Sequence, residues 1–381
     1  MMAIAARVVA HADRSRPADA VLRAELRAQR GLPRNAAREI SRAVFAYFRW
    51  RGFISPDRRK PEWPELHAPV KWQLAKTQEL AERYANSPDS FSDDDFNEAV
   101  PGWVLKEMEV SIFWLRALQA EPRLWLRAKR GQGRALAHSL GECWIPLQPA
   151  FADAVEYQGT EDLFRTPEFQ AGEFEVQDIA SQAVGLLCDP QPDETWWDAC
   201  AGEGGKTLHL SDLMRNKGLI WASDRAEWRL KKLKLRARRA GGFNYRMAPW
   251  DGGAKLPTKT KFDGVLVDAP CTGVGTWQRN PHARWTTTPE DVWELSGVQA
   301  NLLARVAPAV KPGGKLIYSV CTLTQAETEK VAQDFSAAFP DFEPLPLTNL
   351  FAPALPPAHP LWLWPQDTQG NGMFVAAWLR K

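Results

Sequence analysis

The sequence predicts an α/β protein in which a mostly parallel, doubly wound sheet follows a helical region and a small α/β region. Two observations support this fold class. From Phe174 onward, short apolar runs typical of buried strands alternate with longer stretches of helical periodicity. Several of these runs end in a carboxylate or a cysteine, and ligands of such sheets bind beyond the carboxyl ends of the strands.

Composition places the chain among globular proteins. Its 381 residues leave room for two or three domains, and 45% of them are hydrophobic and 25% charged. The net charge of +2 excludes a polycation, yet the first fifty residues are rich in arginine. This local basic region is equally compatible with a nucleic-acid surface and with an ordinary solvated helical face. The arginines concerned are Arg7, Arg14, Arg16, Arg23, Arg27, Arg30, Arg34, Arg38, Arg42 and Arg49.

The five cysteines are scattered, and no two of them form a C-x-x-C pair. This spacing argues against a disulfide framework and against a zinc site, so we expect no bound metal. No apolar run reaches the ~18 residues of a membrane span, and the first residues lack the apolar core of a signal peptide. We therefore expect a cytoplasmic protein, in which a thiol stays available as a reagent.

Residues 1–90 are predicted to form a helical domain, because their apolar side chains recur at three- and four-residue spacing. Gly31, Pro33 and the stretch from Gly52 to Pro64 punctuate the expected helices. The polar, acidic stretch from Ser87 to Asp95 is predicted to be a linker or an exposed loop.

Residues 97–175 mix helical and alternating patterns, and this mixture predicts a second, small α/β domain. Its expected elements are a helix from Pro101 to about Leu118, a strand from Leu124 to Ala128 and a helix from Ala135 to Leu140.

Residues 176–381 are predicted to carry the doubly wound sheet. The expected strands are Thr195 to Ala199, Leu219 to Ser223, Phe262 to Asp268, Lys315 to Val320 and Met373 to Leu379. The expected helices are Asp178 to Leu187, Arg229 to Arg239, Pro289 to Val310 and Gln325 to Phe339.

The glycine-rich stretch from Trp197 to Thr207 reads WDACAGEGGKT and joins a predicted strand to a predicted helix. A turn of this kind brings backbone close to a nucleotide-like ligand. A phosphate-binding P-loop requires a glycine five residues before Gly205, where this chain has Cys200, so that motif is excluded. A dinucleotide and S-adenosylmethionine (AdoMet) remain as candidate ligands.

Two further acids end the next segments of the chain. Asp224 lies about twenty residues after the turn, where a carboxylate accepts hydrogen bonds from ribose hydroxyls in NAD and AdoMet sites alike. Asp251 is placed to receive an adenine amino group. The alternative for both acids is that they cap the helix or turn that follows.

Two cysteines and a carboxylate lie at the ends of neighbouring predicted strands. Asp268 and Cys271 belong to the segment DAPCTG, in which a proline and a glycine shape a rigid bend. Cys321 follows the next strand. A single cysteine is usually a small buried hydrophobe, but this combination beside a nucleoside-binding turn indicates chemistry.

Methylation of a pyrimidine carbon uses such a set. A thiolate that adds to carbon-6 of cytosine makes carbon-5 nucleophilic enough to attack the methyl group of AdoMet. A carboxylic acid near ring nitrogen-3 stabilises the adduct, after which a base removes the carbon-5 proton and the thiol is eliminated. The residues alone do not decide which of the two cysteines attacks.

Taken together, the motifs resemble the Sun/Fmu (RsmB-type) family of RNA cytosine-carbon-5 methyltransferases, from about Phe174 to the end of the chain. The matching segments are Gln177 to Gln182, Asp198 to Thr207, Asp224-Arg225, Asp251, Asp268 to Gly273, Arg279-Asn280-Pro281, Arg284-Trp285 and Tyr318 to Thr322.

The resemblance implies a class I AdoMet-dependent methyltransferase fold, which is Rossmann-like. It implies that Cys321 is the nucleophile, that Cys271 assists release of the product and that Asp268 is the catalytic acid. It also implies that AdoMet binds along the turn and at the strand ends beside it. The residues concerned are Cys200, Ala201, Gly202, Glu203, Gly204, Gly205, Lys206, Asp224, Arg225, Asp251 and Asp268.

The chain departs from the family pattern at two places. Glu203 replaces the usual proline of the turn, and we expect this change to loosen it. The pair Glu327-Thr328 stands where the family often has Glu-Asn. Neither change removes a reacting group, so we expect activity to persist.

The first region resembles the NusB-like RNA-binding domain of the bacterial rRNA members, and the second resembles the small α/β domain that precedes the catalytic domain. The resemblance implies an RNA partner, with ribosomal RNA expected first and transfer RNA as the alternative, and we expect a monomer. A catalytically silent RNA-binding ribosome assembly factor is the alternative from another class. Four residues after the Cys271 bend are expected either to contact RNA or to form a plain surface loop. They are Arg279, His282, Arg284 and Trp285.

Overall fold

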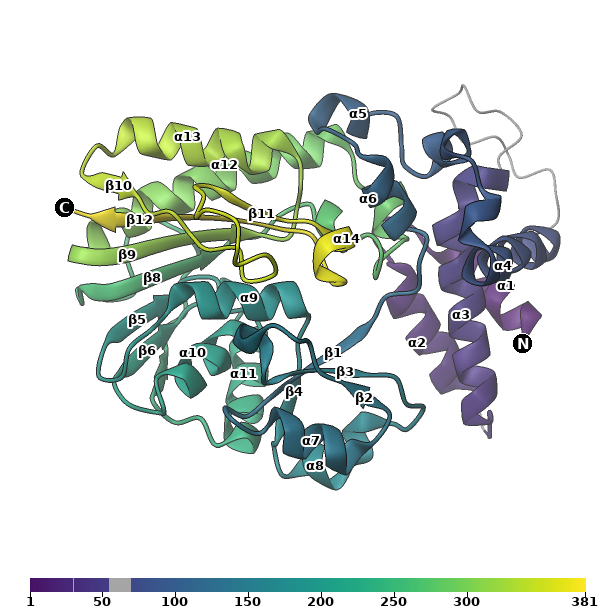
Figure 1. The fold of residues 1–381 in the computed structure, drawn as a ribbon, viewed down its shortest axis with the longest axis horizontal. Helices are drawn as coiled ribbons and strands as arrows, with labels where there is room; N and C mark the ends of the chain where they lie inside the picture. The colour runs from purple at the N-terminus through teal and green to yellow at the C-terminus, as the bar shows by residue number, and fades with distance from the viewer. Residues whose placement is uncertain (30, 55–69) are drawn as a thin grey trace. The chain divides into compact units, whose positions relative to one another are not determined.

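The computed structural model describes residues 1–29, 31–54 and 70–381 (Figure 1). The chain packs as two compact units: Met1–Pro122 with Gly273–Asp291 form the first, and Arg123–Thr272 with Val292–Lys381 form the second. The three-domain division suggested by the sequence stays a prediction, since these units divide the chain at other points. Within the described ranges, every helix is too short or too polar to span a lipid bilayer.

The first unit is helical, as the periodicity predicts. Apolar side chains of α1 to α4 meet in one core that includes Val8, Leu22, Val44 and Leu74. Arg30 and residues 55–64 of the predicted Gly52 to Pro64 break lie outside the described residues. The helices are α1 (Met2–His11), α2 (Ala18–Ala28), α3 (Arg34–Trp50), α4 (Val70–Asn86), α5 (Val104–Glu107) and α6 (Ile112–Ala117).

Two segments of this unit, Pro101 to Leu118 and Ser87 to Asp95, test predictions made from the sequence. The single helix predicted from Pro101 to Leu118 is wrong, because α5 ends at an extended Met108 and α6 starts at a new cap. The side chain of Ser111 accepts a hydrogen bond from the backbone N–H of Trp114, which favours a helix start there. The acidic stretch Ser87 to Asp95 is exposed as predicted, apart from the buried Phe91.

The segment Gly273–Asp291 belongs to the helical unit, although it follows the Cys271 bend in sequence. Arg284 is fully buried there and donates hydrogen bonds to the carbonyl oxygens of Arg49, Ala99 and Leu118. Burial, with the nearby charge of Arg49, lowers the pKa of Arg284 to about 9. The prediction that Arg284 contacts RNA is therefore wrong: its guanidinium satisfies backbone groups inside the protein.

Two neighbours of Arg284 are also engaged within this unit. His282 is 3% exposed and packs edge-on against Phe48, so both alternatives considered for His282, an RNA contact and a plain surface loop, are wrong. The indole N–H of Trp285 donates to the carbonyl oxygen of Phe48 at 2.5 Å. Arg279 is exposed, and an RNA contact of Arg279 stays a prediction.

The second unit begins with a small antiparallel sheet of order β2-β3-β1-β4. One face packs on α7 and α8 through Leu126, Leu136 and Val155, and the other face packs on α9 through Trp125 and Ala154. The predicted strand β1 and helix α7 are confirmed. The bounds are β1 (Leu124–Ala128), α7 (Gly133–Leu140), β2 (Cys143–Trp144), β3 (Ala154–Tyr157), α8 (Pro167–Gln170) and β4 (Phe174–Val176).

The large sheet has the order β10-β12-β9-β8-β5-β6-β7, with β11 paired to β12. The strands β9, β8, β5, β6 and β7 run parallel, and β12 joins β9 antiparallel. The predicted mostly parallel sheet is confirmed. The strands are β5 (Thr195–Asp198), β6 (Leu219–Ala222), β7 (Tyr245–Met247), β8 (Phe262–Asp268), β9 (Val310–Val320), β10 (Phe342–Pro344), β11 (Leu361–Leu363) and β12 (Met373–Arg380). The helices are α9 (Ile179–Cys188), α10 (Gly205–Leu213), α11 (Glu227–Ala240), α12 (Pro289–Val306), α13 (Glu329–Ala338) and α14 (Pro365–Thr368).

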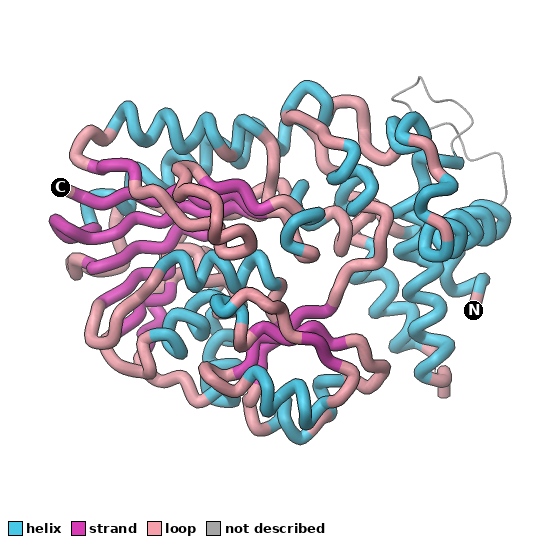
Figure 2. The backbone as a smooth tube through the Cα atoms, viewed as in Figure 1, coloured by secondary structure: helices cyan, strands magenta, loops and turns pink. Residues whose placement is uncertain are grey.

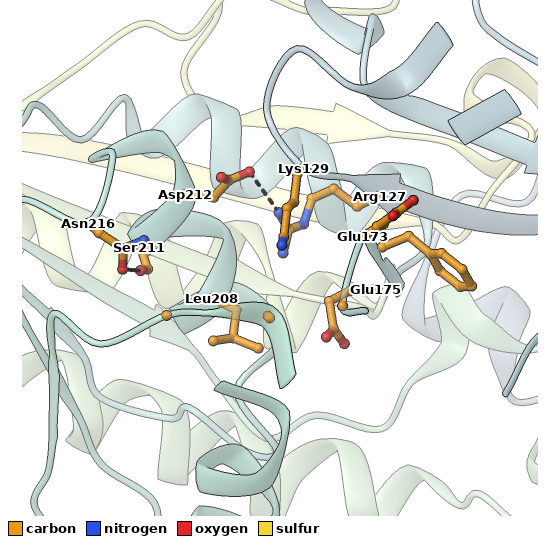
Figure 3. Close-up of a pocket in the computed structure, with 12 residues that line it drawn as sticks. Arg127, Lys129, Glu173, Glu175, Leu208, Ser211, Asp212 and Asn216 are labelled. Atoms are coloured by element: carbon orange, nitrogen blue, oxygen red, sulfur yellow. Dashed lines mark hydrogen bonds and ion pairs between the residues drawn. The ribbon is translucent and has the colours of Figure 1, made fainter. Parts of the chain in front are cut away.

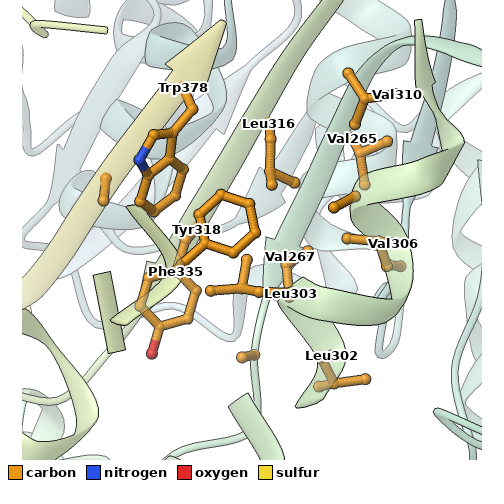
Figure 4. Packing of buried hydrophobic residues seen from close by; sticks show 14 of the residues in the cluster. Val265, Val267, Leu302, Leu303, Val306, Val310, Leu316, Tyr318, Phe335 and Trp378 are labelled. Atoms are coloured by element: carbon orange, nitrogen blue, oxygen red, sulfur yellow. The ribbon is translucent and has the colours of Figure 1, made fainter. Parts of the chain in front are cut away.

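Helices cover both faces of this sheet, as the tube view shows (Figure 2). Successive side chains of a strand point to opposite faces, so Trp196, Leu266 and Ile317 pack toward α9 and α10, whereas Trp197 and Val265 pack toward α12 and α13. Figure 4 shows the second of these layers, in which Leu302, Leu303, Val306 and Phe335 contact Val265, Val267, Leu316, Tyr318 and Trp378. Both faces are largely apolar, and the site residues predicted from the sequence follow the carboxyl ends of the strands.

Candidate active site

The glycine turn leaves the carboxyl end of β5 and leads into α10. The backbone N–H of Gly204 donates to the carbonyl oxygen of Ala201 at 2.8 Å and closes the turn. Gly202 and Gly204 have φ values of +55° and +88°, in the left-handed region that favours glycine. A Cβ on Gly202 would meet nothing within 4 Å, so backbone there stays open to a ligand.

Gly204→Ala is expected to lower the free energy of unfolding by roughly 2–4 kcal/mol. A Cβ on Gly204 would lie 2.5 Å from Cγ of the buried Leu233, and overpacking adds to the strain of a left-handed alanine. Gly205→Ala is the matched control, because the nearest atom to its Cβ is 4.0 Å away and its φ is not positive. Urea denaturation measures both variants, and equal stability would contradict the prediction.

Glu203, the departure from the family pattern, is held by α11. Its carboxylate pairs with Lys232 at 2.6 Å, and its carbonyl oxygen accepts from Arg236 at 3.1 Å. Together with the closing hydrogen bond of the turn, these contacts hold the segment without a proline. The loosening expected from the sequence stays a prediction.

Asp224 lies beside the glycine turn, after β6. One carboxylate oxygen accepts from the backbone N–H of Gly202 at 3.0 Å, and the other accepts from that of Ala226 at 2.8 Å. The second bond is the capping contact considered as an alternative, while the first ties Asp224 to the turn. Each carboxylate oxygen has two lone pairs, so acceptor capacity remains for a ligand hydroxyl.

Asp251 and Arg225 are less closely tied to the turn. Both side chains are exposed, and a carboxylate oxygen of Asp251 accepts from the backbone N–H of Gly253 at 2.7 Å. The backbone N–H of Trp250 reaches the carbonyl oxygen of Asp224 at 3.4 Å, so the two segments run side by side. The cofactor roles of Asp251 and Arg225 stay predictions.

Asp198 is a fully buried acid at the end of β5 that the site prediction did not include. One carboxylate oxygen accepts from the hydroxyl of Thr207 at 2.6 Å, and the other has no hydrogen-bond partner among the described residues. Burial raises the pKa of Asp198 to about 7. Burial and the nearby carboxylates also raise the pKa of the Cys200 thiol, which makes Cys200 a packing residue rather than a reagent.

Lys206 and Asp268 form an ion pair of 2.7 Å between the start of α10 and the end of β8. The other oxygen of Asp268 accepts from the hydroxyl of Ser319 at 2.8 Å. Burial by itself lowers the pKa of Lys206, but the charge and hydrogen bond of Asp268 outweigh it and the net shift is upward. Sequence reasoning missed Ser319, whose position two residues before Cys321 was the available signal.

The two cysteine sulfurs meet as the strand order predicts. Sγ of Cys271 lies 3.3 Å from Sγ of Cys321, beyond the length of a disulfide bond. Strands β8 and β9 pair in register at Asp268 and Ser319, so each cysteine follows the same edge of the sheet. A hydrogen bond from one thiol stabilises negative charge on the other sulfur, so the pair suits a thiolate reaction.

A separate pocket lies among β1, β4 and α10 (Figure 3). Arg127 enters it and donates to Asp212 at 3.3 Å, while Glu173 and Ser211 also line it. None of the predicted site residues lines this pocket.

The chain is similar to known ribosomal RNA methyltransferases. The family model described as 16S rRNA methyltransferase RsmB/F matches residues 185–379. The probable ribosomal RNA small subunit methyltransferase B of Synechocystis sp. is 42% identical over 181 residues, which cover 46% of this chain and 40% of that protein. Ribosomal RNA small subunit methyltransferase B of Salmonella paratyphi B is 28% identical over 340 residues, which cover 84% of this chain and 74% of that protein.

Solved structures share the fold. The crystal structure of PH0851 matches with a TM-score of 0.77 at 22% identity, over 99% of this chain and 98% of that chain. The structure of NSun6 from Pyrococcus horikoshii with SFG matches with a TM-score of 0.62 at 19% identity, over 71% and 93% of the two chains. Because the family model covers more than half of its residues, the chain belongs to the RsmB/F family of 16S rRNA methyltransferases.

Proposed function

We propose that this protein is an AdoMet-dependent RNA (cytosine-5-)methyltransferase that acts on ribosomal RNA of the small subunit. The observation that carries the proposal is the pair of sulfurs 3.3 Å apart, at the strand ends where Asp268 and the glycine turn also lie. The aligned segment spans only 40% of the Synechocystis relative. The substrate is therefore inferred from the site together with the family.

The residues of the glycine turn fit AdoMet. Gly202 offers backbone without a side chain, and the carboxylate of Asp224 stands beside it with spare acceptor capacity. Asp198 adds a buried oxygen that has no partner among the described residues. AdoMet, when bound, supplies the methyl group, and the solved NSun6 carries SFG, an AdoMet analogue.

The side chains of the second unit account for the remaining steps. Sγ of Cys321 would bond to carbon-6 of the cytosine, which moves electron density to carbon-5 and ring nitrogen-3. As that bond forms, Asp268 would give a proton to ring nitrogen-3, and the ammonium of Lys206, 2.7 Å away, would pair with the carboxylate that remains. Once carbon-5 carries the methyl group, a base takes the carbon-5 proton and the carbon–sulfur bond breaks, which returns the thiolate, while the proton at ring nitrogen-3 goes back to Asp268. Cys271 lies close enough to assist this release.

RNA is the partner that we propose. Most of the arginines near the start of the chain, which the sequence offered as a basic face, are paired with acids or buried. Arg7, Arg14, Arg16, Arg23 and Arg42 form ion pairs with acids, and Arg49 is buried.

Helix α11 instead exposes Lys231, Lys234 and Arg238, none of which forms an ion pair with a described residue. This stripe suits contacts to RNA phosphates, and such contacts position RNA without reading its sequence.

Bisulfite sequencing tests the proposal directly. The purified protein is incubated with AdoMet and either small-subunit ribosomal RNA or transfer RNA. We expect a protected cytosine in ribosomal RNA only, at one position. Methylation of transfer RNA alone would instead identify transfer RNA as the substrate. Binding of RNA without methylation or AdoMet binding would favour the assembly-factor alternative.

A further inference from the structure

Glu327 is a fully buried carboxylate in the short 3₁₀ turn Gln325–Glu327, which follows Cys321. Burying a charged carboxylate is costly unless hydrogen-bond donors surround it. Here five donors converge on its two oxygens, and every donor belongs to a segment that follows β8 or β9 or to α12. Glu327 makes long-range contacts as well as local ones, because Thr272 lies 55 residues away in sequence.

One group of these donors holds the Cys271 bend. The backbone N–H of Thr272, the residue after Cys271, donates to Glu327 at 2.9 Å, and the Thr272 hydroxyl donates to it at 2.5 Å. On the other side of Cys271, the carbonyl oxygen of Pro270 accepts from the side chain of Gln299 at 2.9 Å. Gln299 also donates to Glu327 at 3.0 Å. The peptide groups that flank Cys271 are therefore fixed by one connected network.

A second group holds the Cys321 segment. The hydroxyls of Thr322 and Thr324 donate to Glu327 at 3.1 and 2.8 Å. The hydroxyls of Thr322 and Thr272 also lie 2.9 Å apart, so either can donate to the other in place of Glu327 and link the residues that follow the two cysteines. Tyr318 completes the network by donating to the carbonyl oxygen of Glu327 at 2.6 Å.

We propose that Glu327 is a positioning residue that holds the Cys271 and Cys321 segments at reacting distance from one another. The inference deepens the proposed methyltransferase chemistry, since it concerns the same two thiols. It follows from one carboxylate accepting hydrogen bonds from the residue after each cysteine. Reacting groups displaced by about 1 Å lose on the order of 100-fold in rate, so this spacing matters to turnover.

Disulfide closure measures the spacing without relying on methyl transfer. Diamide takes two electrons and two protons from the Cys271 and Cys321 thiols, whose sulfurs join, and becomes the corresponding hydrazine. Mass spectrometry of the alkylated, unreduced protein follows the linked peptide. We expect Glu327→Ala to slow closure roughly tenfold or more, because the two segments no longer share an anchor. We expect Glu327→Gln to restore most of the rate, because its amide still accepts from Thr272 and can donate to the threonine hydroxyls.

The matched control is Glu156→Ala. Glu156 is a buried glutamate of β3 that pairs with Arg123 at 2.6 Å and accepts from Gln158, and its polar partners among the described residues include neither cysteine segment. It should lose stability yet close the disulfide at the wild-type rate. If Glu327→Ala does not fold, Thr272→Val and Thr322→Val remove one link each while keeping shape, and each should slow closure. Wild-type closure rates in folded Glu327→Ala, or in both threonine variants, would overturn the proposal.

Turnover provides the second readout. Glu327→Ala should lower kcat for RNA methylation roughly 100-fold while KM for RNA and the affinity for AdoMet stay near wild type. A merely structural role would instead change all three together with stability. If the wild-type protein shows no methylation but the disulfide rates behave as expected, the positioning role stands and the proposed function fails. If methylation occurs and the disulfide rates do not change, the positioning role fails alone.

Discussion

Cys321→Ala is expected to abolish both methylation and the covalent complex with RNA that contains 5-fluorocytosine. Fluorine at carbon-5 cannot be removed as a proton, so the wild-type enzyme stays linked to this RNA through carbon-6. Removing the attacking sulfur removes the only route to the adduct, and loss of a nucleophile typically costs on the order of 10⁴-fold or more in turnover. Denaturing gels detect the linked species.

Cys271→Ala is the informative comparison, because its sulfur lies 3.3 Å from that of Cys321 and geometry alone allows either to attack. If Cys271 serves release, this variant forms the adduct at a rate close to wild type. It should also accumulate a linked complex on ordinary cytosine RNA, where the wild-type enzyme releases its product. An adduct in Cys321→Ala together with none in Cys271→Ala would show that Cys271 is the nucleophile and not Cys321.

Asp268→Asn is expected to lower turnover by roughly 10²- to 10⁴-fold, the usual contribution of a positioned acid. It also leaves the nearly buried ammonium of Lys206 without the carboxylate 2.7 Å away, which should cost roughly 2–4 kcal/mol of stability. Steady-state methylation and urea denaturation measure the two effects. Asp263→Asn is the control, since it removes the 2.7 Å ion pair with Lys311 near the opposite end of β8.

The pH dependence of stability should separate these variants. In the wild type the pKa of Lys206 is raised, so the folded state holds the proton more tightly. The contribution of the pair is then present at neutral pH and is lost only as pH rises through that pKa. In Asp268→Asn the carboxylate charge is gone, so we expect burial to lower the pKa of Lys206. The unfolded state then holds the lysine proton more tightly than the folded state. Stability relative to the wild type should therefore rise as pH approaches the ordinary pKa of lysine from below. A parallel pH profile in both proteins would contradict this account.

The sequence by itself determined the fold class and the edge of the sheet where the chemistry lies. Short apolar runs are local patterns, and they placed β5, β6, β8 and β12 within one residue of their observed ends. Parallel strands align their carboxyl ends, so Asp268, Cys271 and Cys321 were expected to meet. The break between α5 and α6 at Ser111 was not predicted, because a capping hydrogen bond leaves the spacing of the apolar residues almost unchanged.

Only the tertiary structure decided how these groups are held. Arg284 looked like an RNA contact, yet it satisfies three backbone carbonyls in the helical unit. Glu327 was noted only as the neighbour of Thr328, which departs from the family pattern, yet its carboxylate joins the segments after both cysteines. Hydrogen bonds of this kind depend on distances between residues far apart in sequence, and no local pattern records them. The spacing of the two sulfurs is accordingly a property of the folded chain, although both cysteines were evident from the sequence.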